Sequence, residues 1–349
     1  MPQNPIYLDH AATTPLLPEA LLAMQDGWRM WANPSSPHAA GRAARAALES
    51  ARARLKAALG WQGEVIFTSG ASEALALGIG RAKCGQVLVS AVEHDAALRA
   101  AGDAQRLDVG ADGLVILNST KMHLDDTKRP LAVVQQVNSE TGVVQNITEI
   151  SEAVHAAEGV LLCDAAQGAG KLDIPAEADM AVLSAHKFGG PVGVGALLVR
   201  DYALLGPTGG QERGYRGGTE SLPLVLGMVA ALDAGNAWLE NASVMREALT
   251  AQLIENGAEI VAGEALRIPT IAAYRMPGKS SAAQLIRFDG AGIAVSAGSA
   301  CSSGSLKASH VLTAMGYAHP GEVIRVSIGR ETTEAEIARF VAVWKEIRG

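Results

Sequence analysis

Short apolar runs alternate with longer alanine-rich segments along the first two thirds of the chain. Six of these runs have the length and composition of strands: EVIFTS (64–69), QVLVS (86–90), LAVVQQV (131–137), VLLCD (160–164), MAVLS (180–184) and GALLV (195–199). The segments HAAGRAARAALESARARLKAALG (38–60) and SEALALGIG (72–80) predict helices. Continuous apolar strands separated by helices are typical of a parallel sheet covered on both faces.

The pattern changes after a helical stretch predicted over 221–241. The last third alternates more between apolar and polar positions in IPTIAAYR (268–275), GIAVSAG (292–298) and EVIRVSIG (322–329). Helical segments separate these runs, and the last helix is predicted over 333–348. We therefore predict an α/β protein. Residues 14–234 form a large domain with a mostly parallel sheet covered by helices. Residues 1–13 and 235–349 form a smaller α+β domain.

Composition narrows the class of protein. The chain has 349 residues, 48% of them hydrophobic, and a formal net charge of −7, which is typical of a globular, mildly acidic protein. Nucleic acid is not expected as a partner, because phosphate backbones favour basic surfaces. No apolar run reaches the ~18–20 residues of a spanning helix, so no membrane association is expected.

Cysteine usage and the first residues indicate a compartment. Cys84, Cys163 and Cys301 cannot all pair within one chain, and their spacing fits no zinc site, so no metal is expected. The start MPQNPIYLDHAATTP lacks the basic and apolar regions of a signal peptide. A reducing cytoplasm is therefore expected, where thiols remain available for chemistry.

Polar groups follow five of the predicted strands. They are Ser69–Ser72, Glu93–His94, Asn138–Gly142, Asp164–Gln167 and Ser184–Lys187. Ligands of parallel α/β sheets bind beyond the carboxyl ends of the strands, so these groups can converge on one crevice. Each has an ordinary explanation alone: a helix cap, a surface histidine or a solvated lysine. Together those explanations require five independent coincidences at one end of one sheet.

The groups match the needs of pyridoxal 5'-phosphate. A helix that begins with small residues holds a phosphate through its free N–H groups. A carboxylate such as Asp164 keeps the pyridine nitrogen protonated, a histidine can stack on the ring, and a lysine forms a Schiff base and carries a proton.

The sequence resembles the cysteine desulfurases, which belong to the class V aminotransferase family of fold-type I pyridoxal phosphate enzymes. The resemblance runs nearly from end to end. It rests on these motifs: YLDHAATTP (7–15), NPSSPHAAGR (33–42), FTSGASE (67–73), EHDA (93–96), NSETGVVQ (138–145), DAAQGAGK (164–171), SAHKFGGPVGVGALLV (184–199), GGQERGYRGGTE (209–220), GSACSSGS (298–305), SHVLTAMG (309–316) and IRVSIGRETTEAEI (324–337).

The resemblance implies a role for each matching residue of the cofactor site. Lys187 would bind the cofactor covalently and move the substrate's α-proton. His94 would stack on the ring and assist as acid or base, Asp164 would pair with the pyridine nitrogen, and Gln167 would approach the phenolic oxygen. The phosphate would be held by Ala71, Ser72, Ser184 and His186.

Two further implied roles concern the substrate and the assembly. Arg325 corresponds to the arginine that binds the substrate carboxylate, a role suited to its bidentate guanidinium. Thr219 corresponds to the residue that reaches the phosphate of a neighbouring subunit, which implies a homodimer. Ser139 stands where the family usually has an asparagine that contacts the cofactor, and its shorter side chain puts that contact in question.

Cys301 lies in SAGSACSSGS, where small residues allow an exposed loop. The resemblance implies that its thiolate attacks the sulfur of L-cysteine and keeps it as a persulfide, with release of L-alanine. That sulfur would go to an acceptor protein of unknown identity, for iron–sulfur cluster assembly or other sulfur-requiring biosynthesis. The plain alternative for Cys301 is an inert buried thiol.

Other functions remain open at this point. One is another class V reaction, catalysed by an aminotransferase or a selenocysteine lyase; Cys301 argues against transamination, which needs no protein thiol. Another is a non-catalytic desulfurase paralogue, against which Lys187, Asp164 and Arg325 all speak. A nucleotide-binding protein is a weak alternative, since neither a P-loop nor a G-x-G-x-x-G after the first strand is present.

Overall fold

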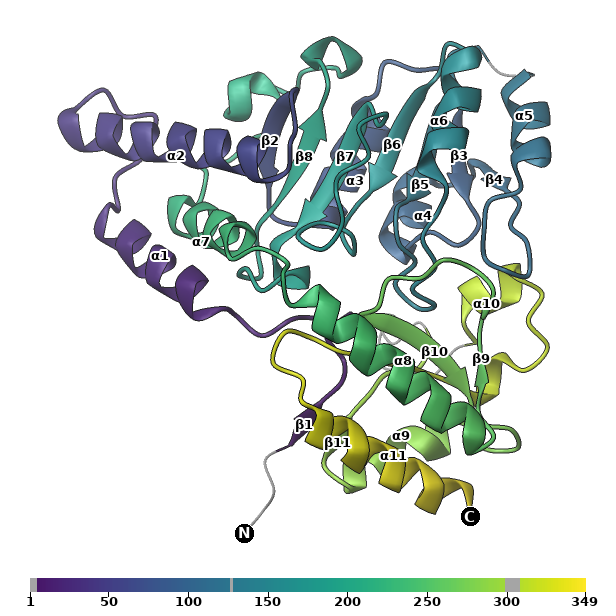
Figure 1. Cartoon of the computed structure of the whole chain (residues 1–349). Coiled ribbons are helices and arrows are strands. Elements are labelled where there is room, and N and C mark those ends of the chain that lie inside the picture. The colour runs from purple at the N-terminus through teal and green to yellow at the C-terminus, as the bar shows by residue number, and fades with distance from the viewer. Residues whose placement is uncertain (1–4, 126–127, 299–307) are drawn as a thin grey trace.

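A seven-stranded sheet forms the centre of the larger part of the molecule in the computed structural model (Figure 1), which describes residues 5–125, 128–298 and 308–349. Its strand order is β2-β8-β7-β6-β5-β3-β4. The strands are β2 (Glu64–Thr68), β8 (Gly195–Val199), β7 (Met180–Ser184), β6 (Val160–Asp164), β5 (Leu131–Gln135), β3 (Val87–Ser90) and β4 (Gln105–Leu107). All six predicted strands are present, and β4 was not predicted.

One strand of this sheet runs against the others. β8 is antiparallel to both of its neighbours, β2 and β7, whereas β3, β4, β5, β6 and β7 pair in parallel. The prediction of a mostly parallel sheet is confirmed. The carboxyl ends of β2, β3, β5, β6 and β7 therefore lie at the same edge of the sheet.

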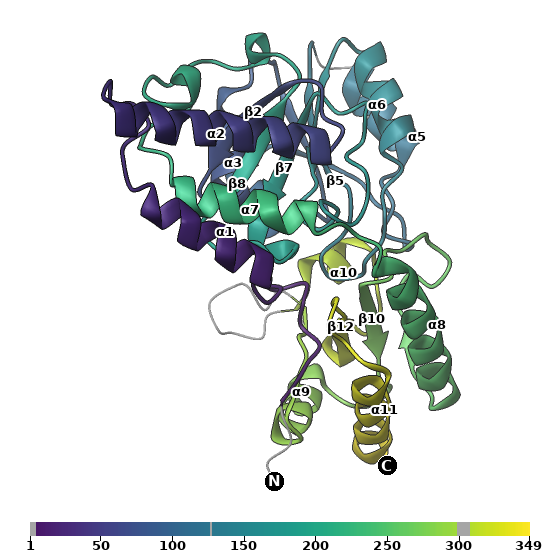
Figure 2. The same cartoon turned by 60° about the vertical axis from the view of Figure 1, so that its left-hand side comes forward.

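Helices cover both faces of this sheet, because its strands are apolar on both sides. Residues of α2 (Ala39–Ala58), α6 (Ile147–Ala156) and α7 (Leu222–Asp233) pack with Leu161 and Cys163 on one face. Residues of α3 (Ala71–Arg81) and α4 (Asp95–Ala101) pack with Leu162 on the other. Figure 2 shows α7 between α1 (Pro18–Arg29) and α2, and α5 (Leu117–Asp125) beside α6.

The prediction of a single helix over 221–241 is wrong. α7 ends at Asp233, and α8 begins only at Leu239 and continues to Glu255. Between them Gly235 has a φ of 71°, a left-handed conformation that ends a helix and that glycine adopts without a steric cost. The chain changes direction here and enters the smaller part of the molecule.

The smaller part contains an antiparallel sheet of order β12-β10-β9. Its elements are β9 (Glu259–Ile260), β10 (Ile271–Arg275), α9 (Ser281–Gly290), β11 (Ile293–Ala294), α10 (His310–Ala314), β12 (Val323–Ser327) and α11 (Glu334–Arg348). A separate apolar core forms around Trp344, Phe340 and Phe288. Among the described residues, no helix combines the length and apolar character needed to cross a bilayer.

The first residues of the chain join this smaller part. β1 (Ile6–Tyr7) pairs in parallel with β11, and Leu8 is buried in the same core as Trp344. From Asp9 the chain passes along the edge of the large sheet before α1 begins. The exact domain boundaries at 13–14 and 234–235 stay predictions.

Candidate active site

The strand-to-turn geometry after β7 positions Lys187. A 3₁₀ turn, Ala185–Lys187, follows Ser184 directly, and the chain then returns into β8. A Cβ on Gly195 would lie 2.4 Å from the Leu183 carbonyl oxygen and 2.8 Å from Gly70, so only glycine allows this approach. The Lys187 amine donates hydrogen bonds to the carbonyls of Ala11 and Ala12, at 2.7 and 2.8 Å.

A cavity of about 350 Å³ opens in front of Lys187 at the carboxyl edge of the sheet. Nine of the predicted site residues line it: Ala71, Ser72, His94, Ser139, Asp164, Gln167, Ser184, His186 and Lys187. They come from five different strand ends, as the sequence predicts. The volume of the cavity and its mixed polar and apolar lining are typical of a site for a small molecule or cofactor, which occupies about 300–1,000 Å³.

One end of the cavity is suited to a phosphate. The helix α3 begins at Ala71, and its N-cap, Gly70, supplies no side chain to satisfy the first N–H groups. These groups and the helix dipole favour an anion. Burial and the charge of Lys187 lower the pKa of His186 to about 4, so its imidazole is neutral at physiological pH and contacts Thr13 Oγ1 at 3.1 Å.

The lining of the cavity also contains a buried carboxylate, Asp164. Asp164 Oδ1 accepts a hydrogen bond from the Ala166 amide at 2.9 Å. Burial raises the pKa of Asp164, and the Ala166 amide, His94 and Lys187 oppose this rise. A cationic ring nitrogen in the cavity would further favour the ionised carboxylate.

His94 and Gln167 complete the cavity wall. Burial is the main cause that lowers the pKa of His94, whose Nδ1 accepts a hydrogen bond from the Ala96 amide at 3.1 Å. Gln167 donates from Nε2 to the Ala11 carbonyl at 2.9 Å. Its buried Oε1 has no hydrogen-bond partner among the described residues.

These residues fit pyridoxal 5'-phosphate. The lining of the cavity offers a helix N-terminus for a dianion, a buried carboxylate for a ring nitrogen and a lysine amine. The amide of Gln167 has an unsatisfied atom in the same wall. A buried polar atom of this kind is rare unless a ligand or water completes its hydrogen bonding.

Arg325 lies outside the cavity lining but is joined to it. Its side chain is buried, donates from Nη1 to the Ser139 carbonyl at 2.9 Å and pairs through Nη2 with Asp9 at 2.6 Å. Cys301 lies outside the described residues. The described residues before and after it contact other parts of the fold. Ser296 pairs with the main chain of Arg325, and the Ser309 hydroxyl donates to Glu140 at 2.5 Å.

Thr219 is not in the cofactor cavity of its own chain. It lines a separate groove of about 260 Å³ together with Trp28 and Trp31 of the α1 region. Both tryptophans are exposed, with Trp31 at 82%. This position agrees with a residue that acts on a neighbouring subunit, although the role itself stays a prediction.

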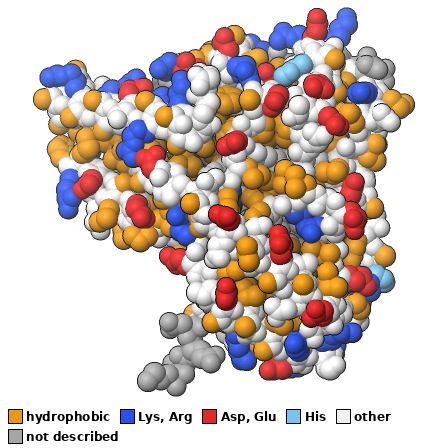
Figure 3. Space-filling model, viewed as in Figure 1, with side chains coloured by type: hydrophobic (Ala, Val, Ile, Leu, Met, Phe, Trp, Pro, Cys, Tyr) orange, Lys and Arg blue, Asp and Glu red, His pale blue; other side chains and the backbone are white. Residues whose placement is uncertain are grey.

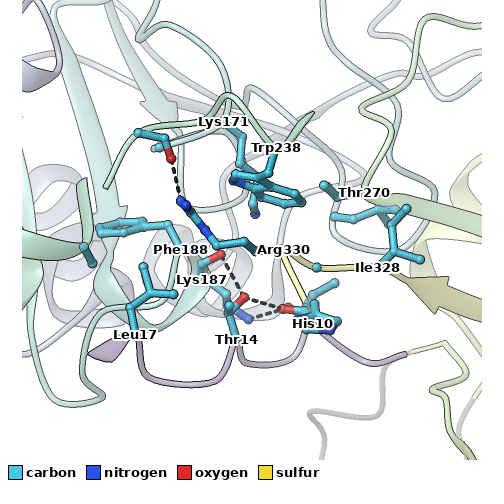
Figure 4. Close-up of a pocket in the computed structure, with 16 residues that line it drawn as sticks. His10, Thr14, Leu17, Lys171, Lys187, Phe188, Trp238, Thr270, Ile328 and Arg330 are labelled. Atoms are coloured by element: carbon cyan, nitrogen blue, oxygen red, sulfur yellow. Dashed lines mark hydrogen bonds between the residues drawn. The ribbon is translucent and has the colours of Figure 1, made fainter. Parts of the chain in front are cut away.

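A second, smaller cavity of about 30 Å³ lies between the two parts of the molecule (Figure 4). His10, Lys171, Trp238 and Arg330 line it, with Lys187 also contributing. Its volume suits one or two water molecules, at roughly 15 Å³ each, and excludes a cofactor. Lys187 therefore lies between a cofactor-sized cavity and a water-sized one.

Several residues of the site escape sequence reasoning. The carbonyls of Ala11 and Ala12 contact Lys187, yet the identity of an alanine says nothing about its carbonyl. Asp9 pairs with Arg325, and Lys171 is buried, with its amine donating to the Gln167 carbonyl at 3.1 Å. The only signal for Asp9 and Lys171 is that each is a charged residue within a motif of the family resemblance.

The chain is similar to known proteins over most of its length. The family model described as aminotransferase class-V matches residues 6–340. The chain belongs to the class V aminotransferase family. A protein of Frankia sp. (strain EuIK1) named cysteine desulfurase is 36% identical, over 95% of this chain and 88% of that protein.

Two solved structures share the fold. A NifS-like protein from Rickettsia africae ESF-5 has a TM-score of 0.91 at 30% identity, covering 99% of each chain. A structure titled SspA in complex with cysteine has a TM-score of 0.81 at 29% identity, covering 94% of this chain and all of the other. The predicted fold class, large sheet domain and smaller α+β part, is therefore confirmed.

Proposed function

We propose that this protein is a pyridoxal phosphate-dependent cysteine desulfurase that converts L-cysteine to L-alanine. The observation that carries the proposal is the convergence of five strand ends on one cavity around Lys187. Relatives of similar length that bear the name cysteine desulfurase support the reaction. The structure titled as a complex with cysteine supports L-cysteine as substrate.

Different cavity residues bind different parts of the cofactor in this proposal. Ala71, Ser72, Ser184 and His186 hold the phosphate at the start of α3, and Asp164 pairs with the ring nitrogen. His94 covers the ring, with Gln167 and Ser139 beside it. Bound there, pyridoxal phosphate supplies an electron sink that stabilises negative charge on the substrate.

Lys187 and Arg325 act on the substrate. Lys187 attaches the cofactor covalently and afterwards takes the proton from the substrate α-carbon through Nζ. Its contacts with the Ala11 and Ala12 carbonyls offer the released amine a defined position close to the cavity. Arg325 binds the substrate carboxylate, and its partner Ser139 places the guanidinium next to the cavity.

Cys301 receives the sulfur. Its thiolate attacks the sulfur of L-cysteine, an S–S bond forms, and the C–S bond breaks with its electron pair remaining on the substrate carbon side. Protonation of that carbon, together with return of a proton to the α-carbon by Lys187, gives L-alanine, so the step needs no external oxidant or reductant. The persulfide then passes its sulfur to an acceptor protein, for iron–sulfur cluster assembly or another biosynthetic use, in the cytoplasm.

The functional unit in this proposal is a homodimer. The α1 region exposes Leu22, Trp28 and Trp31 at 61, 61 and 82%, and exposed aromatic side chains of this kind favour protein interfaces. Figure 3 shows apolar side chains over this part of the surface. Thr219 lies beside these tryptophans, where a partner's phosphate could be reached.

The direct test is to incubate the purified, cofactor-loaded protein with L-cysteine and to measure alanine, and then to add a thiol reductant such as dithiothreitol and measure the sulfide released from the persulfide. We expect both products, and a persulfide on Cys301 detectable by mass spectrometry. Cys301→Ser should still change the cofactor absorbance when L-cysteine binds, yet release almost no alanine and carry no persulfide.

Other outcomes would assign a different reaction. Alanine release by Cys301→Ser at the parent rate would refute the role of the thiol. Transfer of an amino group to an oxo acid, with cysteine left intact, would identify an aminotransferase. Turnover of L-selenocysteine but not L-cysteine would identify a selenocysteine lyase, and cofactor binding without any turnover a non-catalytic paralogue.

A further inference from the structure

Asp9 and Arg325 form an ion pair between opposite ends of the chain. Asp9 Oδ1 lies 2.6 Å from Arg325 Nη2, and the two side chains are 21% and 7% exposed. A buried guanidinium is stable only when its charge is paired and its N–H groups are bonded. Asp9 is the carboxylate that pairs with Arg325 among the described residues.

The main chain fixes the position of Asp9. Asp9 forms a parallel bridge with Ser327 on β12, two residues beyond Arg325. Its carbonyl accepts hydrogen bonds from the Ala12 amide at 3.0 Å and the Tyr7 hydroxyl at 3.1 Å. The backbone of Asp9 is thus held beside the strand that carries Arg325.

Two of the three guanidinium nitrogens of Arg325 make contacts with described residues. Nη2 contacts Asp9, and Nη1 donates to the Ser139 carbonyl at 2.9 Å. Nε is buried and has no hydrogen-bond partner among the described residues. Since an unpaired buried N–H is costly, this donor points to a ligand oxygen that completes the site.

The same short segment also contacts the lysine. Ala11 and Ala12, two and three residues after Asp9, accept the hydrogen bonds of Lys187 Nζ. Asp9 and these carbonyls thus link Arg325 and Lys187 through a few residues of fixed backbone. A shift of this segment would therefore move both Arg325 and Lys187, the two residues that act on the substrate in the proposed function.

We propose that Asp9 is a positioning residue for substrate binding: its carboxylate fixes the Arg325 guanidinium so that Nε and the remaining N–H groups meet the substrate α-carboxylate. This inference rests on the proposed function, in which Arg325 binds that carboxylate. Asp9 itself contacts Arg325 and not the substrate. Its loss should therefore affect ligands with a carboxylate and spare ligands without one.

The test compares L-cysteine with cysteamine, which has the same thiol and amine but no carboxylate. Binding of each to the cofactor-loaded enzyme is titrated by the change in cofactor absorbance. Asp9→Ala should weaken L-cysteine binding about tenfold, equivalent to about 1.4 kcal/mol, and leave cysteamine binding unchanged. Asp9→Asn keeps an oxygen that accepts from Nη2, so it should restore part of the lost affinity.

A double-mutant cycle locates the effect. In an Arg325→Met background, Asp9→Ala should cause no further loss of L-cysteine affinity. Asp103→Ala, which removes an exposed carboxylate on the large part of the molecule, is the matched control and should bind both ligands like the parent. If Asp9→Ala does not fold, Asp9→Asn carries the comparison, since it preserves the shape of the side chain.

Three results would overturn the inference. Equal losses for L-cysteine and cysteamine would mean that Asp9 only stabilises the fold. Tighter L-cysteine binding in Asp9→Ala would mean that Asp9 competes with the substrate for Arg325. A further loss in the Arg325→Met background would mean that Asp9 acts elsewhere. Failure of the proposed function is distinct, because then the parent enzyme would show no absorbance change with L-cysteine.

Discussion

Arg52 and Glu212 form a buried ion pair in which both guanidinium Nη atoms contact the carboxylate, at 2.8 and 3.0 Å. The Glu212 side chain is fully buried, and its Oε2 also accepts the Phe67 amide at 2.9 Å. Phe67 lies on β2, three residues before Gly70, the N-cap of α3. The pair thus fixes the segment that leads to Thr219 against the strand that leads to the cavity in front of Lys187.

Removing one partner of this pair should be strongly destabilising. Arg52→Ala leaves the buried Glu212 carboxylate without its cation, so the free energy of unfolding should fall by about 3–5 kcal/mol. Denaturant unfolding of the variant and the parent measures the difference. Arg45→Ala is the control, since Arg45 is about half exposed on the same helix and contacts Glu49 at 3.2 Å. Its loss should cost no more than about 0.5 kcal/mol, and equal costs would contradict the prediction.

Lys187 should be the only covalent attachment point of the cofactor. Borohydride reduction of the loaded protein, followed by peptide mapping, should place the cofactor on Lys187. Lys187→Ala should still bind pyridoxal phosphate through the phosphate and Asp164 contacts, but release it on denaturation and show no turnover. A reduced adduct on Lys171 or any other lysine would contradict this assignment.

The phosphate end of the cavity should dominate cofactor retention. Ser72→Ala and Ser184→Ala each remove a hydroxyl that can donate to a charged phosphate, and each should weaken cofactor binding by about 1–3 kcal/mol. Equilibrium dialysis gives the affinity. Ser50→Ala, which changes an exposed serine in the middle of α2, should retain the cofactor like the parent. Parent-like affinity in both site variants would place the phosphate elsewhere.

The exposed apolar side chains of α1 and of the residues directly after it should mediate dimer formation. Trp31→Glu introduces a charge at an 82% exposed tryptophan and should shift the protein from dimer to monomer in light scattering. Thr219→Ala should reduce cofactor affinity only in the dimer, because Thr219 does not line its own cavity. Leu266→Glu, at a 73% exposed leucine of the smaller part, should remain dimeric. An active, fully loaded monomer would refute the interface.

Lys171 should make stability depend on pH. Burial, together with the charge of Lys187, lowers the pKa of Lys171 from 10.5 to about 7. Between these values the unfolded chain binds more protons than the folded protein, so the free energy of unfolding rises with pH. Below pH 7 the amine is charged in both states, and the folded protein bears the full cost of burying that charge.

Lys171→Met should remove this dependence, since methionine is similar in shape and uncharged. From pH 7 to 9, the parent should gain stability relative to the variant, by at most about 1.4 kcal/mol per pH unit. Denaturant unfolding across this range measures the gain. Parallel curves for the parent and the variant would show that Lys171 keeps its ordinary pKa in the folded protein.

The sequence by itself determined six of the seven strands of the large sheet and nine of the residues that line the cavity in front of Lys187. A buried strand and the turn after it are adjacent in the sequence, so Ser184, His186 and Lys187 can be recognised together as one motif. The parallel arrangement then brings several such ends to one edge. Nine predicted residues meet in one cavity for this reason.

Only the tertiary structure decided the contacts between distant segments. The Asp9–Arg325 pair joins residues 316 positions apart, and the carbonyls that bind Lys187 belong to alanines with no distinctive side chain. The reversed direction of β8 brings Gly195 against Leu183 on β7 and Gly70 after β2, and the break between α7 and α8 falls at the left-handed Gly235. Hydrophobic pattern reports which face of an element is buried, but the partner that buries it is chosen by packing of the whole chain.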